Sequence, residues 1–373
     1  MSSADESAYG AAGVDYQMLD AGKRNALTEA LATSPALLTA PGGARAVDES
    51  RGEPAFVFEA GGQTLAFVIE GLGTKSVIAR ACEDQLGAHG FHAVAYDTVA
   101  AVVNDLCCVG AVPLVVNAYF ATGGSDWYSH QDRQAGLLAG WRQACEHAGA
   151  TWGGGESPAL SGLVSADEIE LAGSAVGLVP SGSPILGADL ADGDEIVFVD
   201  SSGLHTNGAS LARRIAAQLP GGYGFELPGG ATFGRALLEP SVIYVPLVRV
   251  LLGSDVDVHY LSHITGHGFL KLMRPRPEFT YVIGALPEVP EVLSFLVAQA
   301  EMSPAEAYQT FNMGAGFAVY CAAGDGNRVV SLADACGMRA HVAGHVLAGP
   351  RRVVLPGLGV TFESDALDLT PRG

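Results

Sequence analysis

The segment Glu70-Gly-Leu-Gly-Thr-Lys75 combines a carboxylate, two glycines, a hydroxyl and an amine, directly after an apolar run. This mixture suits a polyphosphate with Mg²⁺, because a carboxylate can hold the metal while backbone N–H groups and a lysine contact phosphate. The segment is not a Walker A loop, in which Gly immediately precedes Lys. The alternative is a plain turn between a strand and a helix.

A second group of polar residues comprises Asp97, Asn104 and Asp105. On a helix, the seven-residue spacing places Asp97 and Asn104 within about 20° of each other. Asp97 could simply cap a helix over residues 98–109. Asn104 and Asp105 precede Leu-Cys-Cys, where burial without a partner such as a metal ion would be costly.

The loop Ser201-Ser-Gly-Leu-His-Thr-Asn-Gly208 lies between a predicted strand and a predicted helix. The free N–H groups at the start of that helix favour an anion. His205 could donate to a phosphate or transfer a proton. Upstream, Trp152-Gly-Gly-Gly-Glu156 offers close backbone approach and another hard oxygen donor, or else only a mobile loop.

Further polar residues lie in His263-Ile-Thr-Gly-His-Gly268 and Thr310-Phe-Asn-Met-Gly314. Two histidines four apart can bind a metal on a helix, but the glycines within the first segment argue against a helix. His341 and His345 repeat this spacing in a predicted terminal strand without a neighbouring carboxylate. No G-x-S-x-G segment supports Ser-His-Asp catalysis.

Alternating strands and helices must position these residues. Hydrophobic patterning predicts strands at 56–59, 64–69, 114–120, 169–179, 195–200, 279–284 and 315–322, and helices at 21–33, 76–88, 98–109, 133–148, 209–218, 240–252, 291–299 and 304–309. Gly61-Gly62 predicts a hairpin, and Asp20 could cap the first helix. The turn-rich segment 188–194 predicts a boundary, so we expect an N-terminal α/β domain at 1–190 and a C-terminal α+β domain at 191–373.

The composition excludes several classes of partner. The 373 residues include 40 Asp and Glu against 20 Lys and Arg, a formal net charge of -20. Such a surface repels nucleic acid and anionic membranes, and no 18-residue uncharged apolar run predicts a membrane span. The six cysteines form no C-x-x-C pair, and no signal peptide opens the chain. We therefore expect a reduced, cytoplasmic setting.

In this order, the segments resemble the aminoimidazole ribonucleotide synthetase family, also called phosphoribosylformylglycinamidine cyclo-ligases. The resemblance covers most of the chain. It is carried by Ala12-Gly-Val-Asp15 with Asp20-Ala-Gly22, Gly71-Leu-Gly-Thr-Lys75, Asp97 with Val103-Asn-Asp-Leu106, Gly110-Ala-Val-Pro113, Tyr119-Phe-Ala-Thr-Gly123, Gly154-Gly-Glu156, Ser201–Gly208, Leu238–Val245, His263-Ile-Thr-Gly266 and Thr310–Gly314.

The resemblance implies N-terminal strands that form a barrel with a second subunit, hence a homodimer, and the cofactors ATP and Mg²⁺. It implies a phosphorylated ribonucleotide substrate, formylglycinamidine ribonucleotide, whose formyl amide oxygen is phosphorylated before the imidazole ring closes. By the same resemblance, nucleotide contacts come from Gly71, Gly73, Thr74, Lys75, Asn104, Thr122, Gly154, Gly155, Ser202, Gly208, Thr265 and Asn312. Metal contacts come from Glu70, Asp97, Asp105 and Glu156, and the catalytic residues are His205, Asn207 and His263.

Four departures mark a divergent member of the family. Glu70 replaces an Asp, and a glycine-rich loop before the first strand is reduced to Pro41-Gly-Gly43. The segment Gly154-Gly-Glu-Ser-Pro-Ala-Leu-Ser161 lacks a second Glu, and His267 stands where Gly is usual. Two alternatives therefore stay open. One is a related ATP-dependent enzyme of the superfamily acting on a different amide or amidine, and the other is a nucleotide-binding protein without turnover.

Overall fold

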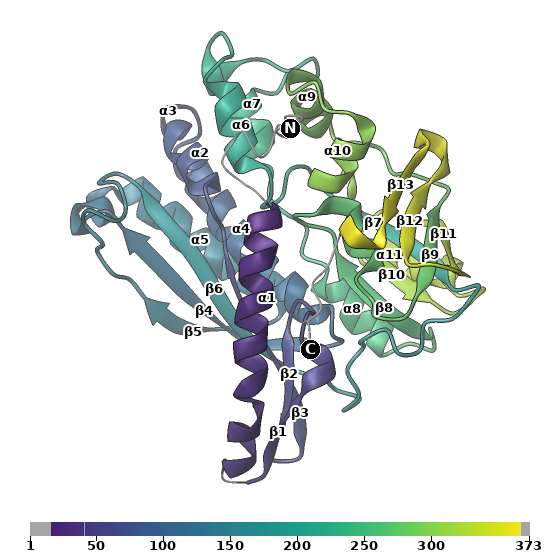
Figure 1. The fold of residues 1–373 in the computed structure, drawn as a ribbon. Helices are drawn as coiled ribbons and strands as arrows, with labels where there is room; N and C mark the ends of the chain where they lie inside the picture. The colour runs from purple at the N-terminus through teal and green to yellow at the C-terminus, as the bar shows by residue number, and fades with distance from the viewer. Residues whose placement is uncertain (1–15, 41, 367–373) are drawn as a thin grey trace, which may run out of the picture.

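The computed structural model describes residues 16–40 and 42–366. The predicted family segment Ala12–Asp15 and Pro41 lie outside the described residues. The described chain forms two sheets with helices packed on them (Figure 1). No helix in the described part of the chain is long and apolar enough to cross a membrane.

The N-terminal sheet has the strand order β1-β2-β3-β6-β4-β5. Its strands are β1 (Ala44–Val47), β2 (Phe56–Ala60), β3 (Gln63–Gly71), β4 (Val112–Thr122), β5 (Thr151–Glu156) and β6 (Ile169–Leu178). Neighbours are antiparallel except β4 and β5. Gly61 and Gly62 have φ values of 58° and 76°, which the tight turn of the predicted hairpin requires.

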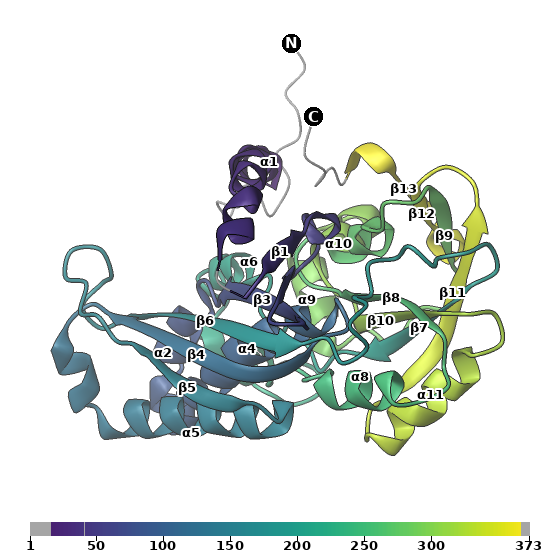
Figure 2. The same ribbon diagram turned by 90° about the horizontal axis from the view of Figure 1, so that it is seen from below.

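One face of this sheet is covered by helices. The helices of this half are α1 (Tyr16–Ala32), α2 (Lys75–Ala81), α3 (Glu83–Leu86), α4 (Ala88–Cys107) and α5 (Gln131–Ala148), with short 3-10 helices at Ser34–Thr39, Asp48–Ser50 and Ser125–Ser129. Helix α4 packs against β3 and β6, and α5 packs on α4. Figure 2 shows α5 and α1 on opposite sides of the sheet.

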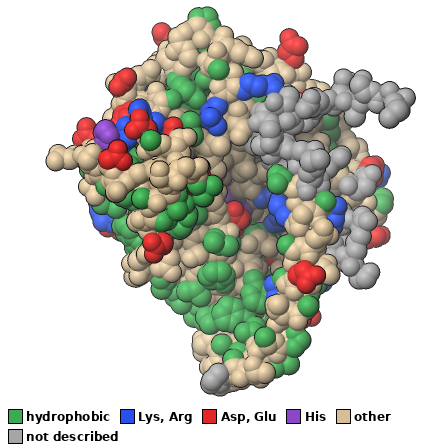
Figure 3. Space-filling view, turned by 60° about the vertical axis from the view of Figure 1, so that its left-hand side comes forward, with side chains coloured by type: hydrophobic (Ala, Val, Ile, Leu, Met, Phe, Trp, Pro, Cys, Tyr) green, Lys and Arg blue, Asp and Glu red, His purple; other side chains and the backbone are tan. Residues whose placement is uncertain are grey.

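The other face of the N-terminal sheet is apolar and open. Its side chains include Phe67, Ile69 and Leu114, which are 44%, 67% and 45% exposed. Hydrophobic side chains gather broadly on the molecular surface in Figure 3. Exposed apolar faces of this kind commonly mark an interface.

The C-terminal sheet has the strand order β13-β12-β9-β11-β7-β10-β8. Its strands are β7 (Glu195–Asp200), β8 (Val258–His263), β9 (Phe279–Ile283), β10 (Ala315–Cys321), β11 (Ala340–Ala348), β12 (Arg352–Leu355) and β13 (Val360–Glu363). Its helices are α6 (Ala209–Ala216), α7 (Phe233–Leu237), α8 (Val245–Leu252), α9 (Glu291–Gln299), α10 (Pro304–Thr310) and α11 (Gly326–Ala335), with 3-10 helices at Gly222–Gly224, Gly268–Met273, Pro356–Leu358 and Ser364–Ala366.

Several expected boundaries differ in the structure. Helix α1 begins at Tyr16, so Asp20 lies within it and does not cap it. Helix α4 begins at Ala88 and passes through Asp97, which is paired to Lys75 and is not an N-cap. The helix expected at 76–88 is interrupted at Cys82.

The helices and strands that were not predicted from the sequence are short or lack a simple apolar pattern. They are β1, β5, β8, β12, β13, α7 and α11. Strand β5, for example, contains three consecutive glycines and was expected as a loop. Its hydrogen bonding to β4 holds this segment as a strand, although its own residues do not favour one.

The imidazole of His259, on β8, lies between two carboxylates. Its Nδ1 is 2.7 Å from Asp194 Oδ2, and its Nε2 is 3.3 Å from Asp257 Oδ2. Burial alone would lower the pKa of His259, but the hydrogen bonds and charges of the two aspartates together raise it. The protonated ring can donate from both nitrogens.

We expect this arrangement to stabilise the protein more at low pH. The contribution of a group with a raised folded pKa is complete below its unfolded pKa, about 6.5 for His, and is lost as the pH rises through the folded value. The Tm difference between wild type and His259→Gln should therefore shrink as the pH is raised from about 6 to about 9.

Thermal unfolding over that pH range measures the difference. His345→Gln, which alters an exposed histidine on β11, is the matched control. A Tm difference for His259→Gln that is the same at every pH would contradict the assignment.

Candidate active site

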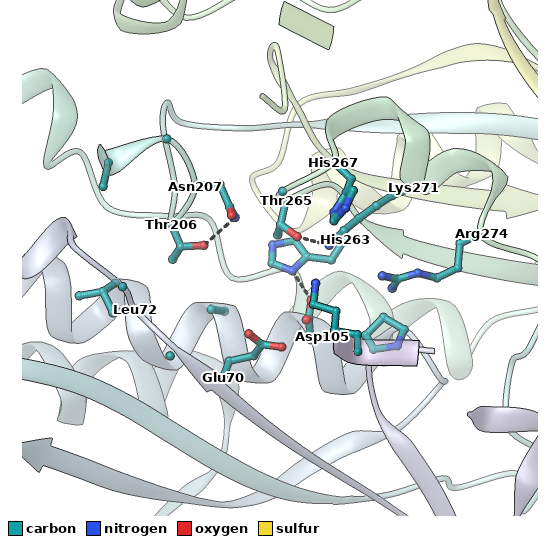
Figure 4. Close-up of a pocket in the computed structure, with 18 of the residues that line it drawn as sticks. Glu70, Leu72, Asp105, Thr206, Asn207, His263, Thr265, His267, Lys271 and Arg274 are labelled. Carbon is teal, nitrogen blue, oxygen red and sulfur yellow. Dashed lines mark hydrogen bonds and ion pairs between the residues drawn. The ribbon is translucent and has the colours of Figure 1, made fainter. Parts of the chain in front are cut away.

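A cavity of about 650 Å³ lies between the two halves of the chain. Its walls come from α1, the end of β3, α4, the loop before α6, the end of β8 and the 3-10 helix at Gly268–Met273. The close-up in Figure 4 shows acidic, basic and imidazole side chains converging on this space. The hollow near the centre of Figure 3 also displays both acidic and basic side chains.

Four basic side chains, called here the cationic group, line the cavity: Lys23, Arg24, Lys271 and Arg274. The whole sequence contains only three lysines, Lys23, Lys75 and Lys271. Two of them lie in the cavity wall and the third is buried close by. In a chain with a net charge of -20, this concentration of positive charge favours an anionic ligand.

Two of these cations belong to the buried wall of the cavity. Lys271 is 6% exposed and donates to Thr265 Oγ1. Burial and the neighbouring Arg274 charge lower the pKa of Lys271 to about 8. The Nε of Arg274 is buried without a hydrogen-bond partner in the described chain. An unsatisfied buried donor is costly, which a ligand acceptor would relieve.

Glu70 and Asp105 form a carboxylate pair on the same wall. Burial raises the pKa of Glu70 to about 8, and the Asp105 charge adds to that rise. Burial also opposes the charge on Asp105, but the hydrogen bond and charge of His263, together with Lys271 and Arg274, bring its pKa down to about 2. Asp105 is thus the anion of the pair, and Glu70 is readily protonated.

His263 ends strand β8 and faces the cavity. Its Nδ1 donates to Asp105 Oδ1 over 2.6 Å, and the residue is 3% exposed. Burial lowers the pKa of His263 in spite of Asp105, so we describe the ring as neutral. A neutral imidazole that donates from Nδ1 keeps Nε2 as an acceptor.

The loop before α6 forms another part of the wall, through Thr206, Asn207, Gly208, Ala209 and Ser210. Gly208 has φ 106°, and a Cβ there would lie 2.5 Å from Phe311 Cε1. Only glycine fits this position. The first N–H groups of α6 have no intrahelical acceptors and favour an anion in the adjoining cavity.

The structure brings together nine of the residues predicted from the sequence. They all line the cavity: Glu70, Gly71, Gly73, Thr74, Asp105, Asn207, Gly208, His263 and Thr265.

Lys75 and Asp97 are not among them, because they pair with each other in the interior. Both side chains are 0% exposed, and their charged atoms are 2.5 Å apart. Lys75 Nζ also donates to the His205 carbonyl, and Asp97 Oδ1 accepts from the Ser241 N–H. In this arrangement the two side chains form a buried ion pair, and their expected roles in phosphate and metal binding stay predictions.

Asn104 lies on the same side of α4 as Asp97, as the seven-residue spacing predicts. Its Oδ1 accepts from Tyr244 N–H and its Nδ2 donates to Val242 O, both over 2.8 Å. Both of these side-chain hydrogen bonds go to the backbone of the C-terminal half. Asn104 thus holds this segment in place and does not line the cavity.

His205, Ser202 and Asn312 also lie behind the cavity wall. His205 Nε2 accepts from the Ser202 and Val242 N–H groups, and burial holds its pKa well below the usual value. Ser202 Oγ donates to Pro240 O. Asn312 donates to Gly203 O and accepts from Ser201 Oγ. These contacts shape the loop, and the three side chains are not among those that line the cavity.

The remaining expected residues lie on two strands away from the cavity. Thr122 is buried at the end of β4, and Gly154, Gly155 and Glu156 are exposed on the edge strand β5. A Cβ on Gly155 would lie 2.1 Å from Ala118 O, so this glycine allows close strand packing. Glu156 consequently lies outside the cavity of its own chain.

None of the four residues of the cationic group was predicted from the sequence. No motif contains Lys23 or Arg24, and Lys271 and Arg274 follow the His263–Gly268 segment without matching an expected position. The rarity of lysine in the sequence was the one available signal. It concerned Lys23 and Lys271, but neither the two arginines nor the convergence of the four side chains.

Matches to two family models show a two-domain protein of the AIR synthase related type. The family model for the AIR synthase related protein, N-terminal domain, matches residues 52–179, and the model for its C-terminal domain matches 191–355. Solved structures agree in fold. A thiamine-monophosphate kinase from Stenotrophomonas maltophilia is 17% identical with a TM-score of 0.57, covering 82% of this chain and 92% of that one. The hydrogenase maturation protein HypE from E. coli is 17% identical with a TM-score of 0.55, covering 83% and 87%.

Curated relatives are more similar in sequence. The phosphoribosylformylglycinamidine cyclo-ligase of Methanothermobacter thermautotrophicus is 35% identical over 77% of this chain and 80% of its own. That of Methanocaldococcus jannaschii is 33% identical over 78% and 80%. The chain therefore belongs to the phosphoribosylformylglycinamidine cyclo-ligase family, and both the expected family and the expected fold class are confirmed.

We expect the buried Lys75–Asp97 pair to resist disruption strongly. Asp97→Asn leaves a buried ammonium without a counterion, which costs about 3–5 kcal/mol of unfolding free energy. Lys75→Met leaves the opposite charge unpaired and should cost a similar amount. The double variant should cost less than the sum, because the two groups interact directly.

Urea unfolding of the wild type, both single variants and the double variant measures this coupling. The exposed α5 pair Arg142–Glu146 is the matched control, for which charge removal should cost below about 1 kcal/mol. Strictly additive effects at Lys75 and Asp97 would contradict the assignment.

Proposed function

We propose that this chain is an ATP-dependent cyclo-ligase that converts formylglycinamidine ribonucleotide to aminoimidazole ribonucleotide, ADP and phosphate. Its family membership supports this activity, since the curated relatives carry that enzyme's name. The observation that carries it is one cavity that combines a carboxylate pair with four basic side chains in an acidic protein. A ThiL protein of the same fold was solved with AMPPCP and TMP, which supports nucleotide binding here.

The proposed reaction has two steps. The formyl amide oxygen attacks the γ-phosphorus of ATP, so that an O–P bond forms and ADP leaves. A nitrogen of the substrate then attacks the activated carbon, the new C–N bond closes the imidazole ring, and the oxygen leaves as phosphate while a proton is released. Phosphorylation turns a poor leaving group into a good one, and the protein mainly positions and neutralises charge.

The cavity residues supply that positioning. We assign phosphate contacts to the cationic group, to Thr74 and to the N–H groups at the start of α6. We assign the proton acceptor to His263, whose Nε2 is available and whose ring is oriented by Asp105. Asn207 and Thr265 line the same space and can bind polar atoms of the substrate.

We assign Mg²⁺ to Glu70 and Asp105. No cluster of three or more metal-binding side chains exists in the described part of the chain. A pair is sufficient, because Mg²⁺ is commonly held by one or two carboxylates plus substrate phosphates and water. The mutual repulsion that contributes to the raised pKa of Glu70 would be relieved by a cation. When bound, the ion would neutralise phosphate charge.

We further propose that residues 1–190 form a dimerising domain and that residues 191–373 form the domain that completes the site. The open apolar face of the N-terminal sheet supports a homodimer in which two such faces meet as a barrel. All six cysteines are unpaired, in keeping with a cytoplasmic setting.

The activity is tested by following phosphate release and imidazole formation from ATP and Mg²⁺, with and without formylglycinamidine ribonucleotide. We expect both products only with the complete mixture. ATP binding without substrate-stimulated release would overturn the proposal and favour a non-catalytic role. Release stimulated only by another amide or amidine would instead indicate a different substrate.

Within that assay, Lys271→Met should lower kcat/KM about 10-fold or more, because a charged hydrogen bond to phosphate contributes about 1.5–3 kcal/mol. The matched control is Arg45→Met, which removes an exposed charge on β1 and should have little effect. Equal rates for wild type and Lys271→Met would exclude Lys271 from the site.

Dimer formation is tested separately. Phe67→Asp places a charge on the open sheet face and should yield monomers, because burying an unpaired carboxylate is costly. Leu163→Asp is the matched control, since Leu163 is 80% exposed and lies outside the strands. Sedimentation velocity distinguishes the outcomes, and a Phe67→Asp protein that remains dimeric would contradict the proposed interface.

A further inference from the structure

Residues 19–32 of helix α1 bury very little side-chain surface. Among its residues 19–32, Asp20 alone has a buried side chain, at 8% exposure. Leu19 is 49% exposed and most neighbouring side chains face solvent. A helix of this length is only marginally stable without tertiary packing. The buried contact of Asp20 therefore helps to fix where α1 lies.

Asp20 is bound by His267. Its Oδ2 lies 2.9 Å from His267 Nε2, and the two residues are 8% and 7% exposed. Burial lowers the pKa of His267 to about 4, so the ring is neutral and donates an N–H to the carboxylate. His267 has φ 68°, a backbone conformation that glycine adopts without strain. An imidazole at this position provides a specific attachment point for α1.

This attachment brings two positive charges to the cavity. Lys23 and Arg24 follow Asp20 by three and four residues, so all three lie on one side of α1. Lys23 and Arg24 line the cavity together with Lys271 and Arg274 of the C-terminal half. Half of the cationic group is thus supplied by a helix that a buried hydrogen bond links to His267 of the C-terminal half.

We propose that His267 is a positioning residue that docks α1 through Asp20, so that Lys23 and Arg24 bind phosphate oxygens of a ligand in the cavity. The inference rests on the proposed function in that it takes ATP or the ribonucleotide as this ligand. The shared chemistry is a phosphate group, carried either by the triphosphate of ATP or by the monoester of the ribonucleotide. Arginine and lysine are the side chains that proteins use for such groups.

A mutant cycle separates this role from simple structural support. His267→Gly removes the donor at a position where glycine suits the backbone. Lys23→Ala/Arg24→Ala removes the cations. If His267 acts through them, all three changes together should be no worse than the cation changes alone. Asp20→Ala should loosen α1 as His267→Gly does, although it also removes the 3.4 Å contact between Lys23 Nζ and Asp20 Oδ1, whereas Asp20→Asn keeps an acceptor and should restore most of the function.

We expect His267→Gly and the Lys23/Arg24 variant each to raise a KM about 10-fold, as the loss of charged phosphate contacts would, with kcat changed less than about 2-fold. A rise confined to the KM of ATP assigns the triphosphate, and a rise confined to the KM of the ribonucleotide assigns its monoester. Asn25→Ala, at an exposed site on α1 that does not line the cavity, is the control and should leave both constants unchanged. Effects that multiply in the triple variant, or an unaltered KM in His267→Gly, would overturn the proposal.

Two measurements without turnover keep this test independent of the proposed function. Amide hydrogen exchange over residues 19–32 should be faster in His267→Gly than in wild type, with other helices unchanged. Calorimetric titration with AMPPNP and with ribose 5-phosphate should show, for at least one of the two probes, weaker binding to His267→Gly. Absence of cyclisation with these two results would overturn the enzyme assignment alone. Unchanged exchange in α1 would overturn the docking role whatever the enzyme does.

Discussion

Three buried polar side chains on α4 determine how the two halves of the protein meet. Asp97 pairs with Lys75 and accepts from the Ser241 N–H, Asn104 bonds to the backbone around Tyr244, and Asp105 accepts from His263. Each partner except Lys75 belongs to the C-terminal half. Because unpaired polar groups are costly in an interior, this helix can satisfy its polar side chains only when the halves adopt this relative position. The cavity between them is a consequence.

The electrostatics of the cavity follow from the same arrangement. His263 and the nearby cations keep Asp105 ionised, whereas burial and the Asp105 charge raise the pKa of Glu70. Lys271 and Arg274, from the C-terminal half, act on both carboxylates through their charges. Acidic and basic groups therefore stand together without fully neutralising one another, an arrangement suited to a ligand that carries both phosphate and a divalent cation.

The elements around the cavity differ in how firmly they are attached. Strands β3 and β8 and helix α4 are embedded in the core, so Glu70, His263 and Asp105 are fixed by packing. Over residues 19–32, helix α1 buries only the side chain of Asp20, which His267 binds. The carboxylates and imidazole of the core elements thus share the cavity with Lys23 and Arg24 of a helix that contributes little to the core.

Local sequence patterns were sufficient to predict the strands, helices and turns that neighbouring residues specify. The Gly61-Gly62 hairpin, strand β7 and helix α9 follow from turn residues and hydrophobic periodicity, and the order of the polar segments was sufficient to indicate the family. The spacing of Asp97 and Asn104 placed them correctly on one side of a helix. Pattern alone did not distinguish a residue that binds ligand from one that holds the fold, because a carboxylate serves both purposes with the same chemistry. Only the tertiary structure decided that Lys75 and Asp97 pair with each other and that Glu156 lies on an outer strand. It also decided that the four side chains of the cationic group converge from distant parts of the chain. These outcomes depend on long-range packing, which no local spacing encodes.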